Sequence, residues 1–89
     1  MISITIANND NQDLFVQVWD ANQPGSPQVL SSRINQGGTQ PLQVQEDSNG
    51  NGNINWAAVA ANATPGQVPN TGQVTPANGD TVNVSTWQQ

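Results

Sequence analysis

The chain has 89 residues, and its six acidic residues against a single cation, Arg33, give a formal net charge of -5. It contains no His, Cys, Lys or Tyr, so the usual general bases and most nucleophiles of neutral pH are missing and we expect no enzymatic activity. An acidic chain repels phosphate backbones and anionic lipids, and no apolar run approaches the ~20 residues of a membrane-spanning helix, so we expect neither nucleic-acid binding nor membrane insertion.

Apolar and polar residues alternate along most of the chain, which predicts half-buried β-strands. Ile2, Ile4 and Ile6 alternate with small residues, and after an Asn-rich turn the alternation resumes at residues 14–19. Because only a short turn separates these two segments, the sequence predicts a β-hairpin. Turn-forming Gly, Pro, Asn and Asp also separate the later segments. The strands expected in chain order cover residues 2–7, 14–19, 29–34, 42–44, 54 onward and 81–84.

Two segments are less regular. The Ala-rich residues 57–61 have high helix propensity, but they are few and continue an alternating strand, so we expect strand there, with one helical turn as the alternative. The Pro- and Gly-rich stretch at residues 63–79 predicts a long loop with one short edge strand, because Pro cannot donate a ladder hydrogen bond.

Short strands separated by turns, with no helical period, predict an all-β fold. We expect a single small antiparallel β-sandwich, or a small barrel, of about six to seven short strands. A chain of this length makes one small domain with one core, so residues 1–89 are expected to form a single β-sandwich domain. The expected core consists of the inward-facing apolar residues Ile2, Ile4, Ile6, Val16, Val18, Leu30, Ile34, Leu42, Val44, Ile54, Trp56, Val82 and Val84.

The most specific motif is the turn at residues 47–54, which matches the start of a calcium-binding loop. The bidentate Glu that completes such a loop is replaced by Ala58, so calcium binding would be weak, roughly 0.1 to 1 mM or weaker. The alternative is a plain turn, since turns select Asn and Gly for positive φ. We therefore expect no cofactor beyond, at most, weakly bound Ca²⁺. Its ligands would be the side chains of Asp47, Asn49 and Asn51 and the carbonyl oxygen of Asn53.

The aromatic residues suggest a second site. Strand periodicity places Phe15, Gln17 and Trp19 on the face opposite the inward valines. An exposed Trp offers an apolar plate to a sugar ring, while amides and a carboxylate bind its hydroxyls. The alternative is that Trp19 closes the core, and the same two alternatives hold for Trp87, which opposes Val82 and Val84. The ligand-binding residues of the sugar hypothesis are Gln17, Trp19, Asp20 and Asn22.

The remaining features favour a binding or structural role. Arg33 is expected to pair with one of the six acids. Residues 1–6 alternate and lack basic residues, so we expect no signal peptide in this chain, while the polar, Lys-free composition favours an extracellular or cell-surface location. The sequence thus predicts a non-catalytic interaction or structural module, secreted or surface-exposed, with a protein or glycan partner. The alternative is a carbohydrate-binding, lectin-like module, with or without the calcium loop. The oligomeric state stays open.

Overall fold

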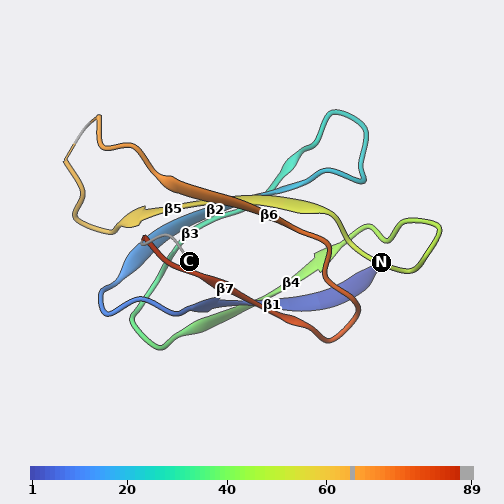
Figure 1. The fold of residues 1–89 in the computed structure, drawn as a ribbon, viewed down its shortest axis with the longest axis horizontal. Coiled ribbons are helices and arrows are strands. Elements are labelled where there is room, and N and C mark those ends of the chain that lie inside the picture. Colours follow the sequence, from blue (N-terminus) through green and yellow to red (C-terminus); the bar gives the residue numbers. More distant parts are fainter. Residues whose placement is uncertain (65, 87–89) are drawn as a thin grey trace.

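Two stacked β-sheets form the molecule, as the computed structural model of residues 1–64 and 66–86 shows (Figure 1). The four-stranded sheet has the order β3-β2-β5-β6 and the three-stranded sheet the order β4-β1-β7. This architecture confirms the predicted all-β sandwich, including the short edge strand within the Pro- and Gly-rich stretch. The strands are β1 (Ile2–Asn8), β2 (Leu14–Asp20), β3 (Gln28–Ile34), β4 (Thr39–Val44), β5 (Ile54–Ala60), β6 (Asn70–Val74) and β7 (Thr81–Val84).

The pairing of the first two strands differs from the prediction. β1 pairs antiparallel with β4 and parallel with β7, whereas β2 pairs antiparallel with β3 and β5. The predicted hairpin is therefore wrong, because residues 9–13 carry the chain from one sheet to the other. The inward face of each strand carries three aliphatic side chains and ends in one buried polar residue, Asn8 or Asp20. Stacking these two faces across the interlayer space buries both of them. The parallel β1–β7 pair also makes the three-stranded sheet mixed, so the sandwich is mostly antiparallel.

Alternating burial identifies the core as the space between the sheets. In β1 and β2 every second residue is buried, and burying a large aliphatic side chain stabilises the fold by about 1.5–3 kcal/mol. Leu14 belongs to this core although it was not expected there, and its side chain is fully buried. Leu30 and Leu42 are only partly buried, because β3 and β4 are edge strands of their sheets.

The edge strand β6 is held to the core by a close contact. Trp56 of β5 faces inward and lies in register with Gly72 of β6. A Cβ atom at Gly72 would stand 2.6 Å from the Trp56 ring, so only glycine leaves room for it. The Asn70 side chain of the same strand donates a hydrogen bond to the carbonyl oxygen of Ser85, at 2.9 Å. These contacts join β6 to β5 and to the residue that follows β7.

Candidate functional site

The predicted outward face of β2 is present. Phe15, Gln17 and Trp19 alternate with buried residues, and Phe15 is 38% exposed while the other two are half-buried. β2 is an inner strand with β3 on one side and β5 on the other. Side chains on an inner strand are positioned by two ladders of hydrogen bonds. This placement confirms that the three residues face away from Val16 and Val18.

Cross-strand neighbours extend this face from β2 onto β5. Phe15 lies opposite Val59 of β5, and Gln17 lies opposite Ala57. Together with Trp19 these residues form a surface that we call the β2 face: Phe15, Gln17, Trp19, Ala57 and Val59. The polar residues in register at its margins are Gln28, Ser31 and Arg33 of β3 and Asn55 of β5.

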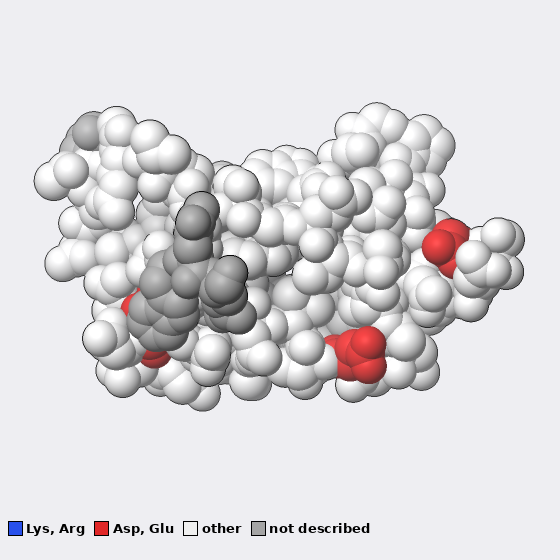
Figure 2. Space-filling model, viewed as in Figure 1, with Lys and Arg blue, Asp and Glu red and all other residues white. Residues whose placement is uncertain are grey.

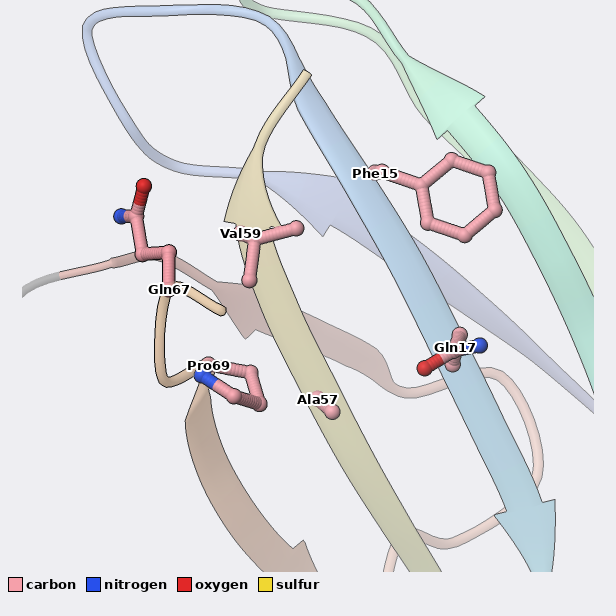
Figure 3. Close-up of a pocket in the computed structure, with 6 residues that line it drawn as sticks. All are labelled: Phe15, Gln17, Ala57, Val59, Gln67 and Pro69. Carbon is pink, nitrogen blue, oxygen red and sulfur yellow. The ribbon is translucent and has the colours of Figure 1, made fainter. Parts of the chain in front are cut away.

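A shallow hollow opens on the β2 face. It has a volume of about 230 Å³ and is lined by residues of β2, of β5 and of the segment before β6. Figure 3 shows Phe15 and Gln17 rising from β2, with Ala57 and Val59 beside them on β5. Gln67 and Pro69 close the far margin of the hollow. The lining therefore combines apolar surface with two neutral amides and contains no charged side chain.

Asp20 does not join this face. It is the inward residue after Val16 and Val18, and it is completely buried. Its carboxylate accepts hydrogen bonds from the Asn22 amide at 3.2 Å, from the Gln23 side chain at 2.8 Å and from the Gln45 amide at 2.8 Å. Side chains alternate along a strand, so the neighbour of an exposed Trp faces the core. The alternation of Val16 and Val18 in the sequence already indicates that Asp20, two residues further on, faces the core.

Asn22 also has a structural position. Its side-chain amide donates to the carbonyl oxygens of Gln45, at 2.9 Å, and Asn51, at 3.2 Å. These bonds connect the turn after β2 to the segment between β4 and β5. The structure thus brings Gln17 and Trp19 together on the β2 face and separates Asp20 and Asn22 from them.

The turn that resembles a calcium loop is closed by its own hydrogen bonds. One carboxylate oxygen of Asp47 accepts from the amides of Asn49, at 2.8 Å, and Asn51, at 3.1 Å. The Asp47 amide in turn donates to the carbonyl oxygen of Asn51 at 2.7 Å, and Gly50 has the positive φ of 82° that the turn requires. In this arrangement the hydrogen bonds of Asp47 to Asn49 and Asn51 hold the turn in its conformation.

The fourth expected ligand oxygen has a partner as well. The carbonyl oxygen of Asn53 accepts a hydrogen bond from the Ala21 amide at 2.8 Å. Over residues 1–64 and 66–86, no three side chains of His, Cys, Asp or Glu converge as a metal site requires. Calcium binding at Asp47, Asn49, Asn51 and Asn53 stays a prediction, and a cation would compete with the hydrogen bonds that Asp47 and the Asn53 carbonyl oxygen already accept.

A second buried carboxylate, which the sequence did not reveal, lies in the segment that crosses from β1 to β2 (residues 9–13). Asp10 is 6% exposed and accepts from the Thr86 amide at 2.7 Å, the Thr86 hydroxyl at 2.6 Å and the Asn11 amide at 2.7 Å. Burial alone would raise the pKa of Asp10, but the hydrogen bonds from Thr86, Asn11 and Gln12 outweigh it. The pKa of Asp10 therefore lies below its usual value.

Arg33 forms the predicted ion pair. Its guanidinium lies 2.6 Å from a carboxylate oxygen of Asp13, and both side chains are exposed. The Gln36 amide, which donates to the other oxygen at 2.8 Å, and Arg33 together lower the pKa of Asp13. On the face of the molecule that Figure 2 shows, the acidic side chains lie apart from one another, and no Lys or Arg side chain is visible.

Comparison of the chain with protein-family models, curated proteins and solved structures finds no match. The part of the chain that the structure describes holds no helix with the length and hydropathy needed to cross a bilayer. Trp87, the other aromatic residue of the sugar hypothesis, lies outside the described residues.

Proposed function

We propose that this protein is a non-catalytic interaction module, secreted or exposed at a cell surface, which binds its partner through the β2 face. The observation that carries the proposal is the exposed apolar surface of Phe15 around a neutral hollow on two inner strands. Contiguous exposed apolar surface bordered by polar groups is typical of binding sites. A sheet interior holds such a surface rigidly, which reduces the entropy lost on binding.

The hydrogen bonds and the ion pair of three acids support a non-catalytic role. The carboxylates of Asp10 and Asp20 accept structural hydrogen bonds from backbone amides, and Asp13 is paired with Arg33. Acid–base chemistry would need a carboxylate that reaches a reacting group. In this molecule those three carboxylates connect segments of the chain.

A carbohydrate ligand is the second candidate, favoured by the position of Gln17. This amide lies between Phe15 and Trp19 along the exposed side of β2, and Gln67 supplies a second amide at the hollow. Aromatic side chains bind the apolar faces of sugar rings, while amides donate to and accept from hydroxyls. In this form of the proposal Gln67 takes the place of Asp20 and Asn22 as the polar partner of Gln17, and both amides line the hollow beside Phe15.

An NMR titration of the ¹⁵N-labelled protein tests the proposal. The ligands are neutral oligosaccharides, an acidic polysaccharide and extended polar peptides, each added separately. We expect at least one class to shift the amides of Phe15, Gln17, Trp19, Ala57 and Val59. Trp19→Ala and Phe15→Ser should abolish those shifts, whereas Val68→Ser, at a residue 84% exposed and outside the β2 face, should leave them unchanged.

The outcomes separate the two candidates. Shifts with neutral oligosaccharides alone, weakened by Gln17→Ala, would support the carbohydrate-binding module. Shifts with peptides alone would support a protein partner. A ligand that binds elsewhere and is insensitive to Trp19→Ala would contradict binding through the β2 face.

A further inference from the structure

The sequence contains three Asn–Gly pairs, at residues 49–50, 51–52 and 78–79. Glycine has no Cβ, so its backbone nitrogen is the least hindered nucleophile that can follow an asparagine. That nitrogen can attack the side-chain carbonyl carbon of the asparagine before it. The structure places the three pairs in different surroundings, and the differences decide which pair can react.

The pair at residues 51–52 is enclosed. Gly52 is buried and its amide donates to the carbonyl oxygen of Pro76 at 2.7 Å. A Cβ at Gly52 would stand 3.0 Å from the Val44 side chain, so the backbone here has little room to rotate. The Asn51 carbonyl oxygen also accepts hydrogen bonds from Asp47 and Asn22. Attack by the Gly52 nitrogen would require this region to open.

The pair at residues 78–79 is held by two hydrogen bonds to β1. The side-chain oxygen of Asn78 accepts from the Ser3 amide at 2.9 Å, and the Gly79 amide donates to the Ser3 carbonyl oxygen at 2.7 Å. The asparagine side chain and the attacking nitrogen are therefore both fixed to the same residue. Both bonds must break before the reacting atoms can meet.

The pair at residues 49–50 has the fewest restraints. Both residues are exposed, and an added Cβ at Gly50 would meet no atom within 4 Å. The Gly50 amide donates only to the carbonyl oxygen of Asp47, at 3.1 Å, which is the longest of the three glycine bonds. Among the described residues the Asn49 side chain has no hydrogen bond, so it can rotate towards the Gly50 nitrogen.

We infer that Asn49 is a site of spontaneous deamidation. The Gly50 nitrogen loses its proton to solvent and forms a bond with the Asn49 side-chain carbonyl carbon. The side-chain nitrogen takes up a proton from solvent, its bond to that carbon breaks, and it leaves as ammonia. Water then opens the resulting cyclic imide at either carbonyl, which gives aspartate or isoaspartate at position 49.

The product changes the turn in two ways. Either product adds a carboxylate two positions from Asp47, which changes the net charge from -5 by one further negative charge. Isoaspartate also inserts a methylene group into the main chain between the two amides, those of Asn49 and Asn51, that Asp47 accepts from. The reaction thus marks the exposed turn covalently as the protein ages, whatever ligand the β2 face binds.

The test follows the side-chain amide signals of Asn49, Asn51 and Asn78 by NMR in the folded protein kept in mildly alkaline buffer. A parallel sample is kept in concentrated urea, and mass spectrometry follows the replacement of NH₂ by OH in both. In the folded protein we expect Asn49 to react at least about tenfold faster than the other two, because their reaction requires local opening. In urea the three rates should converge. Asn49→Gln, with a longer side chain, should remove the fast reaction.

Two results would overturn the inference. One is loss of the Asn51 or Asn78 signal as fast as that of Asn49 in the folded protein. The other is an intact Asn49 in the folded protein after the urea sample has reacted.

Discussion

Two Asn-rich turns serve different purposes in this molecule. Residues 8–13 and 47–53 are both rich in Asn and Asp. In the first turn Asp10 holds Thr86, which lies 76 positions further along the chain. In the second turn the carboxylate of Asp47 holds only the amides of its own turn, two and four positions away.

The difference lies in what surrounds each carboxylate. The first turn crosses between the sheets, so Asn8 and Asp10 are buried and need partners inside the molecule. Asn8 shows the same effect, because its side chain donates to the carbonyl oxygens of Gln12 and Ile34. In the second turn residues 47–50 are exposed, so water can replace the hydrogen bonds that the Asp47 carboxylate makes there. The comparison predicts that equivalent substitutions will have very different effects on stability.

Asp20 is the most deeply buried carboxylate and should give the largest effect. Asp20→Ala removes the acceptor for the amides of Asn22 and Gln45 and leaves both without a partner. We expect the free energy of unfolding to fall by about 3 kcal/mol, measured by urea denaturation. Asp20→Asn keeps the shape and one acceptor, so it should lose less. A loss under about 1 kcal/mol for Asp20→Ala would contradict this role.

Asp10 should follow, with a loss of about 2 kcal/mol for Asp10→Ala, because the amides of Thr86 and Asn11 lose a charged acceptor. Thr86→Val removes the hydroxyl donor from the same carboxylate. If the two groups act together, the double variant should lose less than the sum of the single losses. Additive losses in this urea-denaturation cycle would show that the bond contributes little.

Acid should reduce the stability that Asp10 and Asp13, in the segment between β1 and β2, give to the fold. The pKa values of Asp10 and Asp13 both lie below the ordinary value, so the unfolded chain binds protons more readily than the folded one. Stability is therefore fully present above about pH 4 and falls as the pH drops through and below that value. Asp13 is exposed and screened by solvent, so Asp10 should dominate. Urea denaturation at a series of pH values should show a smaller fall for Asp10→Asn, and a stability that stays constant on acidification would refute this.

The strands and most of the core could be predicted because alternation is a local property of the sequence. For example, the burial of Ile4 and Val16 follows from the alternation of apolar residues with their neighbours along the strand. Strand pairing is not a local property. Two strands with apolar faces can bury them either as neighbours in one sheet or in two stacked sheets, and the hairpin prediction was wrong because β1 and β2 lie in different sheets. The requirement for glycine at residue 72 arises from Trp56 on the next strand. For the candidate site, periodicity predicted the orientation of Phe15 and Trp19, whereas only the fold brings Gln67 to the hollow beside Phe15.

Asp47→Ala should have a small effect, about 0.5 kcal/mol in the same assay, because the exposed amides of Asn49 and Asn51 can bind water instead. The matched comparison is with Asp10→Ala, an identical change in the other Asn-rich turn. An equally large loss at both positions would show that burial is not what separates the two turns.

Calcium should have the smallest effect of all. A dissociation constant near 1 mM would add about 1.4 kcal/mol of stability in about 10 mM Ca²⁺. The ion would compete with the amides that donate to Asp47 and with the Ala21 amide that donates to the Asn53 carbonyl oxygen, so we expect a gain of no more than a few tenths of a kcal/mol. NMR titration with Mg²⁺ as the control measures this directly. Calcium-specific shifts confined to residues 46–55, with the larger gain, would show that the turn exchanges its hydrogen bonds for an ion. In that case the first turn would contribute to stability through its bond to Thr86 and the second turn through bound Ca²⁺. The difference in stability between the two turns would then depend on the calcium concentration and not on the fold alone.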